Sequence, residues 1–136
     1  MEPSYMDLID RLCEALNTVP DLPTRVRIGY MQADDSIGLY PLPGSSVIDQ
    51  DWAGNQTKRI NYEIAIRTKD QELANDSLWK ISNFLEQLND IESKNDSFQF
   101  DEIEQTGLPS VSEQDTQGYS VYMLDFFVDV VTNIKK

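Results

Sequence analysis

The chain has 136 residues, which is about the length of one globular domain, and 40% of them are hydrophobic. Its longest apolar run is a few residues, far short of the roughly 20 that a membrane-spanning helix needs. The first residues lack a basic region followed by an apolar stretch, which is the pattern of a secretory signal. We therefore expect a single domain over residues 1–136. We also expect it to have no membrane partner and to stay in the cytoplasm of the cell that makes it.

Acidic side chains dominate the charge, because 24 of them against 11 basic ones give a formal net charge of −13. Nucleic-acid binding depends on Lys and Arg side chains that neutralise phosphates, so this composition argues against a protein that binds a duplex tightly. The chain has no histidine, and Cys13 is its single cysteine. The absence of histidine excludes histidine-based triads. Cys13 lies inside a helical pattern, where a lone cysteine is usually a small buried hydrophobe. We expect a protein that is not an enzyme, holds no metal or cofactor, and acts through contact surfaces.

Two segments show the periodicity of amphipathic helices. In Ser4–Val19, leucines recur at every fourth position, Ser4 is the expected cap and Asp7 lies three residues further on. A second helix is predicted over Asp70–Leu88, where the four residues from Thr68 match a capping pattern. Its apolar residues recur at spacings of four and three: Ala74, Leu78, Ile81, Leu85 and Leu88. Two turns of repeat are too few for a coiled coil, so each apolar stripe is expected to lie on a sheet.

Five segments show the alternation of β-strands: Arg25–Met31, Ile37–Leu42, Arg59–Thr68, a strand beginning at Phe98, and Tyr119–Asn133. The first two are separated by a short acidic turn, so we expect them to form a hairpin. The predicted fold is α/β, of the α+β type. Two helices pack on one face of a mixed, mostly antiparallel sheet of about five strands, in the order α-β-β-β-α-β-β.

The last predicted strand has two faces of different character. One face is apolar and is formed by Tyr122, Leu124, Phe126, Val128 and Val130. The other face places Asp125 and Asp129 on either side of Phe127, which is typical of a strand that a neighbour partly covers. These two carboxylates either line an acidic surface or pair across strands with basic side chains. The candidates for such pairs are Arg25, Arg27 and Arg67.

The stretch from Ile37 to Lys58 ends a strand and continues as a long connection that carries apolar residues where a simple loop would be polar. It holds Val47, Ile48 and Trp52 between Pro-rich and Gly-Asn turns, with too little repeat pattern to predict an element. Connections of this length are usually functional or disordered, and disordered ones are poor in apolar residues. We therefore expect an arm that orders against its own domain or against another copy of the chain.

Several stretches resemble proteins of one family: Ile28–Met31, Asp34–Gly44, Asn61–Ile66, Ala74–Trp79 and Gly118–Val131. They are similar to the minor capsid or tail terminator (tail completion) proteins of long-tailed bacteriophages with non-contractile tails. The resemblance covers nearly the whole chain and preserves the order of the elements. It carries no catalytic signature.

The resemblance implies a virion protein that is made in the host bacterial cytoplasm and acts at the head–tail junction. Subunits would form a hexameric ring on the finished tail tube, stop its growth and offer a surface to the head connector. The implied partners are other copies of the chain, the tail tube protein and the head completion protein, while DNA passes without specific binding. The implied contacts come from the arm with Val47, Ile48 and Trp52, and from the 107–117 loop with Leu108 and Val111.

A ring of six copies, each with a net charge of −13, would have to keep this charge away from the subunit contacts. An acidic inner wall would repel DNA and let it slide through. Asp125 and Asp129 are candidates for this wall. Two alternatives belong to other classes. An acidic protein that imitates DNA and binds a partner without catalysis would need carboxylates spaced along one surface like phosphates. A small hydrolase would need two carboxylates that converge in a pocket.

Overall fold

The computed structural model describes residues 6–29, 35–107, 109–114 and 117–133 of the chain. It has two helices, α1 (Leu8–Leu16) and α2 (Gln71–Gln87), and one sheet. Its strands are β1 (Val26–Ile28), β2 (Ser36–Pro41), β3 (Ser46–Gln50), β4 (Asn55–Thr68), β5 (Gln99–Gln105), β6 (Ser110–Gln114) and β7 (Ser120–Asn133). The predicted α+β class, with a mixed and mostly antiparallel sheet, is confirmed. In the described ranges, neither helix is long and apolar enough to cross a membrane.

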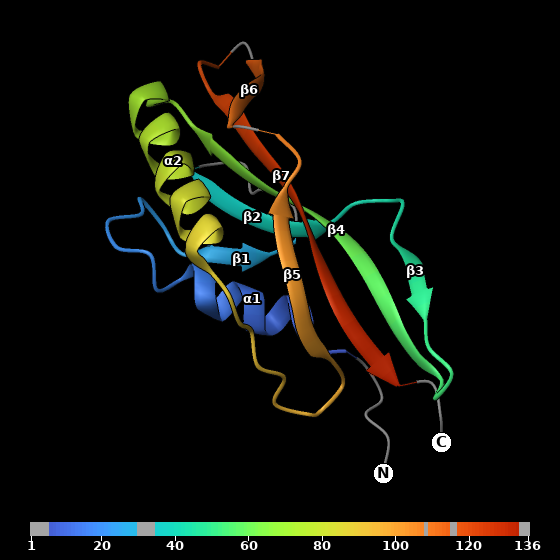
Figure 1. Ribbon diagram of the computed structural model, residues 1–136. Coiled ribbons are helices and arrows are strands. Elements are labelled where there is room, and N and C mark those ends of the chain that lie inside the picture. The colour runs from blue at the N-terminus through green and yellow to red at the C-terminus, as the bar shows by residue number, and fades with distance from the viewer. Residues whose placement is uncertain (1–5, 30–34, 108, 115–116, 134–136) are drawn as a thin grey trace.

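The sheet is organised around a ribbon of two long antiparallel strands (Figure 1). β4 and β7 pair without interruption from Asn55↔Asn133 to Thr68↔Ser120. The outer edge of β4 is shared by β2 and β3, which take its second and first halves. The outer edge of β7 is shared in the same way by β5 and β6. The half of the ribbon formed by the start of β4 and the end of β7 extends beyond the helices and pairs with β3 at its side (Figure 1).

Both helices cover the same face of the sheet, as predicted (Figure 1). On that face, Ile37 and Leu39 of β2 are register partners of Ile66 and Ile64 of β4. The core that the helices bury includes these helix and sheet side chains: Leu8, Leu12, Leu16, Ala74, Leu78, Ile81, Leu85, Tyr62, Leu124, Phe126, Val128 and Val130. Burying one such Leu or Ile side chain contributes roughly 1.5–3 kcal/mol, so packing on the sheet holds the helices in place.

Three strand predictions differ from the structure. β1 pairs with β2 in parallel, with Val26 opposite Ile37, so the expected hairpin is wrong. Alternating burial is the same in both orientations, and therefore the pattern could not distinguish them. β3 and β6 are additional strands in segments that we expected to be loops. Tyr30 and Met31, at the end of the first predicted strand, lie outside the described residues.

The helix starts also differ from the predicted caps. Thr68 does not cap α2, because it still belongs to β4 and pairs with Ser120. Asp70 caps this helix instead, and its carboxylate accepts a hydrogen bond from the Leu73 N–H at 3.0 Å. At α1 the N-cap position is occupied by Asp7, whose carboxylate accepts hydrogen bonds from Ser93 and the Lys94 N–H. The predicted cap Ser4 lies outside the described residues.

Candidate functional site

The hairpin formed by β3 and the start of β4 carries three exposed apolar side chains, including Trp52, the most exposed large hydrophobic among the described residues. Trp52 at its tip is fully exposed, and Val47 and Ile48 of β3 have exposed fractions of 48% and 44%. The expectation that this stretch forms no element of its own is therefore wrong, because β3 pairs with β4 from Ser46↔Arg59 to Gln50↔Gln56. We call residues 46–59 the β3–β4 hairpin. It lies on the side of the molecule away from α2 (Figure 1).

A β-bulge lies at the two consecutive apolar residues of β3, in a strand whose five residues are all exposed. Val47 lies opposite Lys58 and Asp49 opposite Thr57, so Ile48 is the extra residue in the register. A bulge of this kind breaks the alternation of side chains and re-aims them. Val47 and Ile48 can therefore both contact a partner on the hairpin's surface.

The tip of the hairpin is fixed by the side chain of Asp51. Its Oδ1 atom accepts hydrogen bonds from the backbone N–H groups of Ala53 and Asn55, both at 2.9 Å. Its Oδ2 atom accepts one from the Asn55 side-chain amide at 3.0 Å. The bonds from Asn55 lower the pKa of the Asp51 carboxyl, which stays ionised at neutral pH. Trp52 thus projects from a turn whose backbone is held on both sides.

The second predicted contact segment is less prominent. Val111 of β6 has an exposed fraction of 57%, and a bulge follows it in the pairing with β7. Leu108, the other residue predicted in this loop, lies outside the described residues. Figure 1 shows β6 at the opposite end of the molecule from the tip of the β3–β4 hairpin. One copy therefore presents exposed apolar side chains at two separate places.

The carboxylate of Asp129 is buried and has a basic partner that the sequence pattern did not identify. Both of its oxygens accept hydrogen bonds from Arg59 at 3.0 Å, and the guanidinium lies 3.9 Å from the centroid of the Phe127 ring. These bonds raise the pKa of Arg59. Bidentate pairs of this kind have fixed geometry. The charge of Asp129 is therefore balanced by Arg59, on the face of the sheet that the helices do not cover.

The three arginines that were candidates for pairing lie elsewhere. Arg25 and Arg27 are at the β1 edge, and the strand order β1-β2-β4-β7 places two strands between them and Asp129. Arg67 lies opposite Val121, with its guanidinium 3.7 Å from the centroid of the Tyr119 ring. The cross-strand pairing of an aspartate on β7 is thus present, but with a different arginine.

Asp125 faces another acid. It is the register partner of Glu63, and Glu63 is in turn opposite Tyr40, whose hydroxyl donates a hydrogen bond to it. Glu63 is only 6% exposed, and its burial together with the neighbouring Asp125 raises its pKa to about 7. Ionisation of the buried Glu63 would place a second negative charge beside Asp125, so the protonated form of Glu63 is favoured. This row of three side chains lies in the sheet and opens into none of the described hollows.

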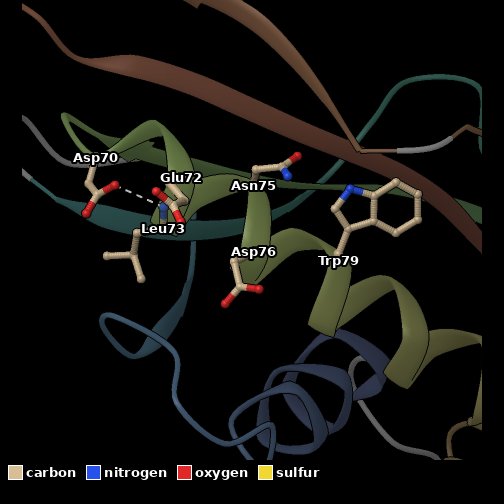
Figure 2. Close-up of a pocket in the computed structure, with 6 residues that line it drawn as sticks. All are labelled: Asp70, Glu72, Leu73, Asn75, Asp76 and Trp79. Carbon is tan, nitrogen blue, oxygen red and sulfur yellow. Dashed lines mark hydrogen bonds between the residues drawn. The ribbon is translucent and has the colours of Figure 1, made fainter.

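The hollow along α2 does not form a catalytic pocket. It has a volume of about 630 Å³ and lies along the outer side of α2, where Asp70, Glu72 and Asp76 contribute carboxylates beside Trp79. Figure 2 shows these side chains spread along the helix, with Asp70 bonded to the Leu73 N–H rather than directed at a common point. Among the described residues, no three His, Cys, Asp or Glu side chains are placed to hold a metal ion.

Sequence reasoning missed three residues that shape these surfaces. They are Arg59 and Glu63 on β4 and Asp51 at the tip of the β3–β4 hairpin. A signal existed for Asp51. It precedes Gly54 and Asn55 by three and four residues, between two extended segments, and Asp at the start of such a turn often bonds to the backbone that follows. For Glu63 there was none, since its burial depends on the Tyr40 ring of a neighbouring strand.

Comparison with known proteins agrees with a role that depends on contact surfaces. The model of the family described as bacteriophage tail terminator protein matches residues 13–132. This range includes both long strands, the β3–β4 hairpin, α2 and β6. Among curated proteins, none matches the sequence significantly. Since the family match covers most of the residues, the chain belongs to the bacteriophage tail terminator protein family, whose members are structural components of the phage tail.

Proposed function

We propose that this protein closes the growing end of the tail tube as a ring of identical subunits, ends tail polymerisation and forms the surface to which the head completion protein joins. The observation that carries the proposal is the β3–β4 hairpin, with the fully exposed Trp52 on a tip fixed by Asp51. Large exposed aromatic side chains on preorganised elements are typical hot spots of protein interfaces. The family supports tail components as partners.

The apolar surface of the hairpin extends beyond its tip. Val47 and Ile48 continue it along β3, and β4 behind them is paired over its whole length with β7. Because the hairpin shares this ribbon with the core, it is attached to the domain through paired strands rather than through a flexible loop. We therefore assign subunit and tail contacts to Val47, Ile48 and Trp52, with Val111 at a second contact.

The charge distribution supports a path for DNA through the ring. Asp129 is neutralised by Arg59, and Asp125 is adjacent to Glu63, so these two aspartates add little to an acidic surface. Asp101, Glu102 and Glu104 of β5 are exposed at the sheet's outer edge. We propose that these exposed acids form the inner wall that repels the DNA backbone and prevents it from adhering.

The test is a double variant of the hairpin, Ile48→Asp with Trp52→Ala, supplied to cells infected with phage that lacks the wild-type gene. Both side chains are exposed, so the thermal midpoint of the purified protein should change by no more than a few degrees. Electron microscopy of lysates should show tails of uncontrolled length and heads that are not joined to tails.

A matched control replaces an exposed aromatic residue elsewhere. Trp79→Ala removes a Trp that is 40% exposed on α2, and tails should keep their normal length. Normal tails in the hairpin variant would refute the assignment of the contact to this hairpin. Unfolding of the variant would instead show that the hairpin belongs to the core.

A further inference from the structure

A second hollow lies on the side of the molecule opposite the β3–β4 hairpin. It has a volume of about 340 Å³ and is formed by residues 18–20, which follow α1, and by the C-terminal half of α2. Val19, Pro20 and Phe84 are its apolar lining residues, and we call the exposed polar residues Asn83 and Gln87 its rim. We call it the α1–α2 groove. Figure 1 shows the helices that form it on the left and β3 on the right.

The groove matches the tip of the hairpin in size and in charge. A volume of about 340 Å³ lies within the range of pockets that enclose aromatic groups, and a Trp side chain buries roughly 150–250 Å² when it is covered. Lys80 is the one charged residue among the described residues that line the groove. The tip carries Asp49 and Asp51 on either side of Gln50, directly before Trp52. An indole beneath a lysine ammonium also gains a cation–π contact.

The larger hollow on α2 is a poor receptor for the same tip. Its described lining includes Asp70, Glu72 and Asp76, all acidic, so an acidic tip would be repelled there. Lys80 pairs with Asp76 at 3.2 Å on the exposed surface of the helix. Such a pair contributes little in water, and its lysine can therefore turn toward an incoming acid.

We propose that the tip of the β3–β4 hairpin in one subunit, led by Trp52, docks into the α1–α2 groove of the next subunit in the ring. Tip and groove lie on opposite sides of one copy, so the tip of a copy does not meet its own groove. A contact between two different patches is heterologous, and repetition of such a contact closes a ring when its rotation allows it. The inference deepens the proposed ring and rests on it.

The experiment is disulfide capture on assembled tails. Ala53 lies next to Trp52 at the tip, and Asn83 and Gln87 lie at the rim of the groove; all three are exposed. In a Cys13→Ala background, Ala53→Cys is combined with Asn83→Cys or with Gln87→Cys, and purified tails are oxidised. A disulfide requires Cα atoms within roughly 4.4–6.8 Å of each other, so it forms only when tip and rim are adjacent.

The expected result is a ladder of covalent multimers up to the full ring on denaturing gels, reversed by reduction, from at least one of the two pairs. The control pair Ala53→Cys with Asn75→Cys, at the other end of α2, should give no ladder. Each reduced variant should keep its thermal midpoint within a few degrees of wild type, which shows that it folds. No ladder from either rim pair, a covalent dimer only, or a crosslink between the tip and the tube protein would overturn the inference.

A groove-filling variant gives an independent measurement. Asn83→Trp places an indole at the rim of the groove and should abolish capping while the thermal midpoint stays within a few degrees of wild type. The matched change Asn75→Trp should leave capping intact. If Trp52→Ala abolishes capping but Asn83→Trp does not, the proposed function stands and the groove is not the receptor. If neither variant alters capping, the hairpin contact assigned under the proposed function fails together with the inference.

Discussion

Glu63 and Asp125 lie directly opposite each other on the two longest strands of the sheet, and both are acidic. The Oδ1 atom of Asp125 is buried and accepts no hydrogen bond from the described residues. The hydroxyl of Tyr40 donates to Glu63 from the other side. A proton on Glu63 avoids placing two negative charges together in this part of the sheet. The centre of the ribbon is therefore most stable when this pair holds one proton.

The first prediction concerns the dependence of stability on pH. The pKa of Glu63 rises from its ordinary 4.5 to about 7 in the folded protein, mainly because of burial. The folded state thus binds this proton more tightly than the unfolded chain. Its contribution to stability is complete below pH 4.5 and is lost as the pH rises through 7. The free energy of unfolding should fall by up to about 3 kcal/mol across this range.

Glu63→Gln isolates this effect, because the amide resembles the protonated acid and cannot ionise. Urea unfolding between pH 5.5 and 8.5 should show a smaller slope with pH in this variant and a higher stability at pH 8. The chain has no histidine, so few other groups titrate in this interval. Glu104→Gln makes the same charge change at an exposed site and should keep the wild-type slope. An unchanged slope in Glu63→Gln would contradict the raised pKa of Glu63.

The second prediction concerns the apolar stripe of α2. Leu85 is 2% exposed and belongs to the core between this helix and the sheet. Leu85→Ala removes three buried carbon atoms and leaves a cavity, which costs about 2–5 kcal/mol. The thermal midpoint should drop clearly, whereas Asn83→Ala, on the exposed side of the same helix, should change it little. A Leu85→Ala protein with the wild-type midpoint would show that the stripe does not hold the helix on the sheet.

The helices and long strands could be predicted because their apolar residues repeat with a clear period over many residues. α2 begins and ends within one residue of the predicted range, and the buried face of β7 is the predicted one. β3 could not be recognised, because all five of its residues are exposed and a bulge breaks their alternation. The strand exists through its hydrogen bonds to β4, which no local pattern in 46–50 reveals.

The candidate surface was predictable in part for a similar reason. Val47, Ile48 and Trp52 are conspicuous in a polar segment whatever structure it adopts, so composition alone indicated a contact. The partner of Asp129 was not predictable, because several arginines share its polarity and only the register of β4 with β7 selects Arg59. Register over a 14-residue ladder depends on the whole fold rather than on nearby residues.

The third prediction is that Cys13 is inert. Its thiol is partly buried beside the core, donates a hydrogen bond to the Val26 carbonyl, and has its pKa raised by burial. The thiolate is the reactive form, so alkylation by iodoacetamide at pH 8 should be slow in the folded protein and fast in urea. Cys13→Ala should assemble normal tails with at most modest destabilisation. Loss of assembly in a folded Cys13→Ala protein would assign this residue a role that its surroundings do not indicate.

The last prediction concerns the tip of the β3–β4 hairpin, where Asp51 organises the turn that presents Trp52. Asp51→Ala removes the acceptor of the bonds from Ala53 and Asn55, while every apolar contact residue stays in place. The turn is exposed, so the thermal midpoint should change little. Trp52 should nevertheless lose its fixed position, and binding must then supply the entropy of ordering several residues, roughly 1–2 kcal/mol for each backbone fixed.

Asp51→Ala should therefore produce overlong tails in infected cells, as the loss of Trp52 itself would. Asp51→Asn is the matched control, because its side-chain oxygen can still accept from the two backbone N–H groups although the charge is lost. It should cap tails better than Asp51→Ala, with a smaller defect that reflects the lost charge opposite Lys80. Equal defects in both variants would show that the charge of the tip matters more than its shape, and normal capping by Asp51→Ala would show that a preformed turn is not needed for the contact.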